Sequence, residues 1–96
     1  MSPINKKKLS VIRIKLDKLD NELLKLIKKR SNLVNEVLKV KIHKKEIIDQ
    51  KRINFILKKI KKKSIKLKID TKITNRIWKN MIWSFIDYEK RNFKKK

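Results

Sequence analysis

The chain has 96 residues, no cysteine and a formal net charge of +22, which comes from 31 basic and 9 acidic residues. A chain of this length forms one domain with a modest hydrophobic core, and without cysteine it can form neither a disulfide framework nor a thiolate metal site. No run of about eighteen apolar residues occurs and no apolar signal-peptide segment follows the basic N-terminus, so we expect a cytoplasmic protein that does not span a membrane.

The predicted elements begin with a basic, flexible tail over residues 1–8, followed by one long amphipathic helix over residues 9–41. This helical stretch contains no glycine or proline, and its apolar residues recur mostly in steps of three and four, as on one face of a helix. These residues are Leu9, Ile12, Leu16, Leu19, Leu23, Leu26, Ile27, Leu33, Val34, Val37 and Val40.

The predicted first helix is too long for a compact chain of this size. At about 1.5 Å per residue it spans roughly 50 Å, which exceeds the width expected of a domain of this length. The remaining residues of the chain cannot cover such a helix. We therefore expect its overhang to be buried against a second copy of the chain.

A second, shorter helix is predicted after a loop over residues 42–46. It begins near Asp49, a residue type that caps helix N-termini well. It ends at the basic run of residues 61–63, where positive charges oppose the helix dipole. Its inward-facing residues are predicted to be Ile53, Ile56, Leu57 and Ile60.

The third helix is predicted to follow a connector over residues 64–69. Asp70 or Thr71 caps its start, and the helix runs to about Phe93, before a basic tail over residues 94–96. Its inward-facing residues are predicted to be Ile73, Ile77, Met81, Phe85 and Tyr88. The sequence thus predicts an all-α fold with three helices per chain, in the order long, short and medium.

The composition gives the few arginines more weight than the many lysines. Glycine and alanine are absent, and the dominant residues have A/T-rich codons, so the excess of lysine fits a low-GC genome as well as a polyanion-binding surface. Where lysine is the default cation, an arginine is a candidate for bidentate carboxylate binding, which lysine does badly. The arginines are Arg13, Arg30, Arg52, Arg76 and Arg91.

Three of these arginines and one lysine could form one anion-binding pocket. Arg13 and Arg30 lie about 25 Å apart along one helix, so they can meet only if two long helices pack antiparallel in a dimer. Arg30 and Lys41 are separated by about three turns and lie close to the same face. Arg52 at the start of the second helix could complete the cluster. Such a pocket fits an anionic ligand, most simply a dicarboxylate.

The sequence also resembles the all-helical chorismate mutases, a family that includes isochorismate-pyruvate lyase. Residues 12–30 read IRIKLDKLDNELLKLIKKR, which is similar to the family's opening I-R-x-x-I/L-D-x-L/I-D-x-x-L-L-x-L-L-x-x-R. Residues 37–41 (VLKVK) and 48–52 (IDQKR) resemble its V-x-x-x-K and D-x-x-R motifs, and residues 77–89 its last-helix block. The resemblance covers residues 9–93 and implies an intertwined homodimer in which both chains build each active site.

The resemblance also implies a role for each candidate residue. Arg30, with Arg13 of the partner subunit, would hold the two carboxylates of chorismate, and Lys41 and Glu89 would address its ether oxygen. Arg52 would assist a carboxylate, and Asp49 would lie near the ring hydroxyl; the alternative interpretation of Asp49 is an N-cap with no other role. The implied reaction is the Claisen rearrangement of chorismate to prephenate in phenylalanine and tyrosine biosynthesis, on the shikimate pathway. It uses no cofactor.

Two positions depart from the mutase pattern and keep the alternative activity open. Ile53 stands where many mutases have a glutamate that bonds the ring hydroxyl, and Phe85 stands where a small hydroxyl residue is common. Both changes resemble isochorismate-pyruvate lyase, which eliminates pyruvate to give salicylate. Because aromatic amino-acid synthesis is the commoner need, we predict the mutase activity first.

Glu89 carries a prediction about pH. A carboxylate facing an oxygen that gains negative charge would repel it, so Glu89 should act in its protonated form. Apolar neighbours favour that form, whereas Lys41 and the arginine cluster oppose it. We therefore expect activity to fall as the pH rises, and a flatter profile for Glu89→Gln.

A basic helical nucleic-acid-binding protein is the remaining alternative. Only the charge supports it, because the lysines are spread over every polar face without a recognition motif. We expect no nucleic-acid partner. His43 has no second ligand near it in the sequence, so no metal site is expected, and Trp78, Trp83 and Phe93 are interpreted as packing residues.

Overall fold

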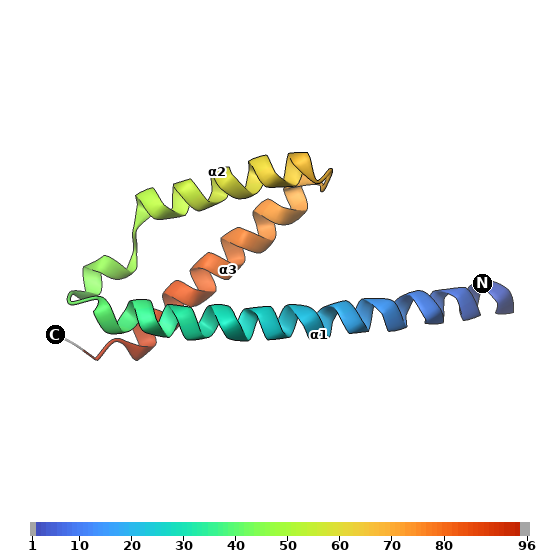
Figure 1. Ribbon diagram of the computed structural model, residues 1–96, viewed down its shortest axis with the longest axis horizontal. Helices are drawn as coiled ribbons and strands as arrows, with labels where there is room; N and C mark the ends of the chain where they lie inside the picture. The colour runs from blue at the N-terminus through green and yellow to red at the C-terminus, as the bar shows by residue number, and fades with distance from the viewer. Residues whose placement is uncertain (1, 95–96) are drawn as a thin grey trace. The chain divides into compact units, whose positions relative to one another are not determined.

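The computed structural model describes residues 2–94. Its elements are the helix α1 (Pro3–Val40), a short 3-10 helix (Lys44–Ile47), α2 (Gln50–Lys66) and α3 (Thr71–Asn92) (Figure 1). No strand occurs among the described residues, so the all-α class and the long, short and medium order of the helices are confirmed. The chain divides into two compact units, residues 1–33 and residues 34–96, and each is described by itself.

The helix α1 begins at Pro3, whereas residues 1–8 were predicted to be a flexible tail. Ser2 caps it, because the backbone N–H of Asn5 donates to the Ser2 hydroxyl at 3.1 Å. Proline fits the first helical position, where its missing N–H has no helical partner to lose. The dipeptide Ser2-Pro3 signals a helix start, but the start predicted at Leu9 was based on the spacing of apolar residues alone. Met1 and residues 95–96 of the two predicted tails lie outside the described residues.

Much of the apolar stripe of α1 is exposed. No residue of α1 is buried, and most residues of its apolar stripe are about half exposed, from 45% at Ile27 to 61% at Leu33, whereas Leu9 and Val34 are half-buried. Burying apolar area is the main term that stabilises an amphipathic helix in water. In a single chain, α1 therefore lacks most of the stabilising free energy that burial of its apolar face would give.

The second helix begins where the sequence predicted. The Asp49 carboxylate accepts a hydrogen bond from the backbone N–H of Arg52 at 3.0 Å, which is the N-cap geometry. The helix continues to Lys66 instead of ending in residues 61–63. Ser64, predicted to lie in the connector, is buried inside the helix.

The end of α2 explains this difference. The backbone N–H of Ile69 donates to the Ser64 carbonyl at 2.9 Å and that of Lys68 to the Ile65 carbonyl at 3.1 Å, the pair of bonds that defines a Schellman motif. Lys68 takes the left-handed conformation, with φ of 57°. The motif usually has glycine there, and this chain has none, so the usual end signal was missing from the sequence.

Lys68→Gly should therefore stabilise the fold. A left-handed conformation strains any residue with a Cβ atom, so the substitution should raise the free energy of unfolding by about 1 kcal/mol. Lys66→Gly, which removes the same charge from inside α2, should lower it by a similar amount. Urea denaturation followed by circular dichroism measures both, and a destabilised Lys68→Gly variant would contradict the assignment.

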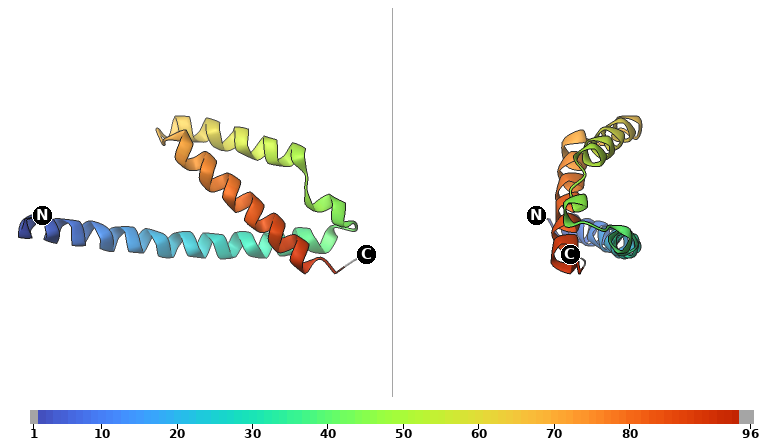
Figure 2. Two further views of the ribbon diagram at one scale, coloured as in Figure 1. Left: turned by 180° about the vertical axis from the view of Figure 1, so that it is seen from behind. Right: turned by 90° about the vertical axis from the view of Figure 1, so that its left-hand side faces the viewer.

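A small hydrophobic core joins α2, α3 and the 3-10 helix within residues 34–96. It consists of Ile47, Ile53, Ile82 and Ile86, with Ile56, Leu57 and Phe93 packed against it. The predicted inward face of α2 is thus confirmed. In both views of Figure 2, α2 and α3 meet at the short turn between them.

The predicted inward face of α3 is partly wrong. Met81, Phe85 and Tyr88 are half-buried, but Ile73 and Ile77 are more than half exposed. The buried positions are Thr74, Ile82, Ile86 and Glu89, which lie about one residue further along the helix. Near the turn the buried face of α3 includes a polar residue, since the Ser64 and Thr74 hydroxyls hydrogen-bond at 2.7 Å and both residues are buried.

Candidate active site

The structure brings Lys41 and Glu89 together within residues 34–96. Lys41 follows the last residue of α1, and Glu89 lies in the last full turn of α3. The Lys41 ammonium nitrogen lies 2.9 Å from Oε1 of Glu89, and the two side chains are only 18% and 7% exposed. Both positions were predicted to address one atom of a ligand.

A buried ion pair of this kind is poor evidence for a purely structural role. Removing an ammonium and a carboxylate from water costs several kcal/mol each, and their attraction often does no more than offset that cost. A pair of apolar residues would pack the same space at no such cost. The ammonium also has three N–H donors, and Glu89 uses one of them. Lys41 can therefore bind Glu89 and an acceptor atom of a ligand at the same time.

Tyr88 and Asn35 support this pair from the neighbouring turns. The Tyr88 hydroxyl donates to Oδ1 of Asn35 at 2.7 Å and links α3 to the end of α1. This bond fixes the residue next to Glu89, so it positions Glu89 opposite Lys41. Sequence reasoning placed Tyr88 inward and missed Asn35. The available signal was a polar residue one turn from Ser31 and from the apolar Leu38, on the same side of the helix.

Asp49 and Arg52 lie together in the first turn of α2. Asp49 acts as the N-cap, as described above. This structural role is the alternative that the sequence left open for Asp49. Arg52 is exposed, and its guanidinium lies over the Phe55 ring, 5.5 Å from the ring centre. Within the described residues neither side chain has a hydrogen bond or ion pair with Lys41 or Glu89.

Arg13 and Arg30 both lie on α1 in the unit formed by residues 1–33. Arg13 is exposed and Arg30 is half-buried. Their separation along a single straight helix excludes a shared ligand within one copy of α1 (Figure 1). Their predicted convergence thus depends on a second chain.

The two departures from the mutase pattern have different surroundings. Ile53 is 6% exposed and belongs to the hydrophobic core, where an unpaired glutamate would be costly. Phe85 is half-buried on α3, one turn before Glu89. Ile53 is therefore explained by packing, whereas Phe85 stands close in sequence to the ion pair.

Neither a metal cluster nor a membrane span is found in the described part of the chain. Across residues 2–94, no three histidine or carboxylate side chains are grouped so that they could hold a metal ion. His43 precedes the 3-10 helix and is exposed. In the same residues no helix combines the length and the apolar character needed to cross a membrane.

These features define a class of protein: an all-α chain of three helices that sets a buried lysine–glutamate pair where the end of its long helix meets its last helix. The model of the family "Chorismate mutase type II" matches residues 12–90. The chain belongs to this family, which acts on chorismate, and the resemblance noted in the sequence is confirmed. Searches of curated proteins and of solved structures returned no match to the chain.

Proposed function

We propose that the protein is a chorismate mutase that converts chorismate to prephenate in the cytoplasm, for phenylalanine and tyrosine biosynthesis. The observation that carries this proposal is the buried contact of 2.9 Å between Lys41 and Glu89 in a chain of this family. The reaction breaks the ether C–O bond and forms a C–C bond within one molecule. The bond changes occur in one concerted step without an external electron or group donor, and we propose that no cofactor takes part.

Each proposed site residue has a task in that reaction. Arg30, with Arg13 of the partner subunit, binds the two carboxylates and holds the side chain folded over the ring, which removes much of the entropic barrier. Lys41 donates to the ether oxygen as negative charge grows there, and a protonated Glu89 donates from the other side. Arg52 assists at a carboxylate, and Asp49 lies near the ring hydroxyl.

The proposed site requires two copies of the chain. Support comes from α1, in which most residues of the apolar stripe are exposed and none is buried. In an antiparallel pair of α1 helices, Arg13 of each copy would approach Arg30 of the other. We therefore propose a homodimer with two equivalent sites.

Isochorismate-pyruvate lyase is the second candidate, and Phe85 favours it. An aromatic residue one turn before Glu89 resembles the lyase more than the mutase. Ile53 adds less support, because its burial in the core already explains it.

Incubation of the pure protein with chorismate and with isochorismate, separately, tests the proposal. We expect prephenate from chorismate, seen as loss of the chorismate ultraviolet band. Salicylate plus pyruvate from isochorismate, with no prephenate, would establish the lyase. Failure to turn over either substrate would overturn both activities, and steeply salt-dependent DNA binding would then favour the nucleic-acid alternative.

A further inference from the structure

The helix α2 has the densest positive charge of the three α-helices. Eight of its 17 residues are lysine or arginine and none is aspartate or glutamate, whereas α1 and α3 both contain carboxylates. A codon bias toward lysine adds cations to every helix, but it does not by itself remove the carboxylates from one of them. The charge of α2 is therefore a local feature of this helix.

The cations of α2 include an exposed row on its outer side. The core residue Ile53 marks the buried side of the helix, and residues spaced by three and four positions lie exposed on the opposite side. Its members, which we call the α2 basic face, are Lys51, Phe55, Lys58, Lys62 and Lys66. Within the described residues none of these four lysines forms an ion pair, so their ammonium groups face water along about 22 Å of helix.

An aromatic ring lies among these cations. Phe55 is 55% exposed and is not one of the core residues. The Arg52 guanidinium lies 5.5 Å and the Lys59 ammonium 6.0 Å from the centre of its ring. A nucleobase stacked on this ring would therefore bring its phosphate close to positive charge. Arg52 belongs to the proposed active site and is not counted in the α2 basic face.

We propose that the α2 basic face binds single-stranded nucleic acid. Its row of ammonium groups is complementary to a row of phosphates, and their contact releases the counterions condensed on the strand. The Phe55 ring offers a stacking surface that any unpaired base can use, whereas a duplex keeps its bases stacked on one another. The proposal departs from the expectation, drawn from the sequence, of no nucleic-acid partner, and it does not depend on the proposed enzymatic activity.

An anionic membrane surface fits the α2 basic face less well. A helix that lies in a membrane interface buries an apolar face at the boundary of headgroups and acyl chains. The apolar side of α2 is already used inside the chain, because Ile53 belongs to the hydrophobic core and Leu57 packs against it. The outer side offers charge and a single ring, which suits a phosphate backbone with unpaired bases.

Fluorescence anisotropy of the full chain with a labelled oligothymidylate of about 15 nucleotides tests the proposal. If each of the four lysines neutralises one phosphate, the affinity should fall by at least about 50-fold between about 50 mM and 200 mM salt. An affinity that does not change with salt, or no binding at the lower salt concentration, would overturn the proposal.

A triple variant, Lys58→Gln with Lys62→Gln and Lys66→Gln, removes most of the charge of the α2 basic face. It should bind the oligonucleotide about tenfold or more weakly than wild type at the lower salt concentration. Glutamine is a good helix former, so the circular dichroism spectrum should not change. Chorismate turnover should not change either, because none of the three lysines is a proposed site residue.

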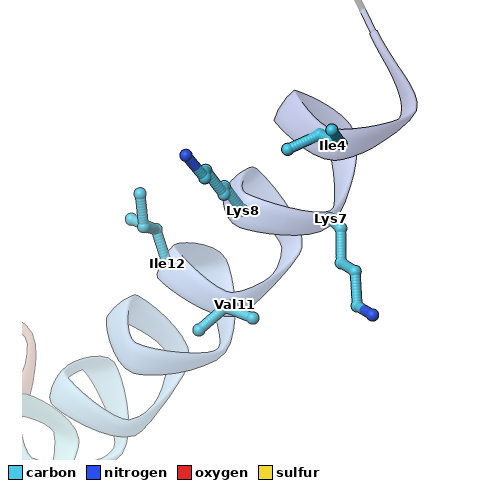
Figure 3. Close-up of a pocket in the computed structure, with 5 residues that line it drawn as sticks. All are labelled: Ile4, Lys7, Lys8, Val11 and Ile12. Carbon is cyan, nitrogen blue, oxygen red and sulfur yellow. The ribbon is translucent and has the colours of Figure 1, made fainter.

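The matched control removes three lysines from the start of α1, as Lys6→Gln with Lys7→Gln and Lys8→Gln. There the Lys7 and Lys8 side chains point to different sides of the helix, beside the apolar Ile4 and Val11 (Figure 3), and α1 contains no aromatic residue. This variant should bind the oligonucleotide within about twofold of wild type. Equal losses in the two triple variants would show that net charge alone holds the strand, and the α2 assignment would be wrong.

Phe55→Leu separates stacking from charge. Leucine keeps an apolar side chain but removes the ring, so the affinity for the single strand should fall by about tenfold, while the affinity for a duplex of the same length should not change. A variant that binds the single strand as tightly as wild type would refute the role of Phe55 and the preference for single strands. Binding of wild type to phosphatidylserine vesicles, without binding to the oligonucleotide, would instead identify a membrane surface as the partner.

Discussion

Arg30→Ala should abolish turnover and leave a folded dimer. In each proposed site, Arg30 is one of the two guanidinium groups that bind the carboxylates, and alanine replaces neither its charge nor its paired N–H donors. We expect kcat/KM to fall by about three orders of magnitude, which corresponds to roughly 4 kcal/mol of transition-state stabilisation. Because alanine favours helices, the circular dichroism spectrum and the sedimentation of the variant should match those of a helical dimer.

Arg76→Ala is the matched control for this prediction. Arg76 is an exposed arginine on α3 and is not a proposed site residue. The substitution therefore removes the same charge from a position outside the proposed site. Its kcat/KM should stay within about twofold of wild type. Arg30→Ala with wild-type activity would refute the assignment of the site.

Glu89→Gln should change how activity depends on pH. In the proposed mechanism a protonated Glu89 donates to the ether oxygen, next to the Lys41 ammonium that lies 2.9 Å from its Oε1. If that protonated carboxyl is the donor, the wild-type rate should fall as the pH rises. The glutamine amide donates at every pH, so the variant should give a nearly flat profile and exceed wild type at the alkaline end.

Asp87→Asn serves as the control, since Asp87 is an exposed carboxylate of α3 that pairs with Arg91. It should keep the wild-type pH profile. A Glu89→Gln profile that matches wild type would instead show that Glu89 does not donate a proton to the substrate. Rates are measured from the loss of chorismate absorbance in buffers of constant ionic strength.

The parts of the fold that could be predicted from sequence depend on local signals. Asp49 and Asp70 marked the starts of α2 and α3, and both accept backbone hydrogen bonds as N-caps. Periodicity identified the core face of α2 because Ile53, Ile56, Leu57 and Ile60 are all apolar. Local signals of this kind do not depend on how the elements pack.

The missed features depend on contacts between elements. The buried face of α3 includes Thr74, which hydrogen-bonds to Ser64, and hydrophobic patterning assigns both of these polar residues to the outside. The left-handed turn at Lys68 was hidden because lysine stands where glycine is usual. In the site, Lys41 and Glu89 were paired through motif resemblance, and no periodicity alone would have joined residues on different helices.

The ion pair between Lys41 and Glu89 has one more consequence, which concerns the order of folding. Forty-eight positions separate the two residues, and all of α2 lies between them. Closing a loop of that length costs about 3 kcal/mol in chain entropy, so the contact forms late, after local helices exist. Catalytic activity would then appear only at the last step of folding. In a denaturant titration, we expect activity to be lost at the same denaturant concentration as the helical circular dichroism signal, or at a lower one.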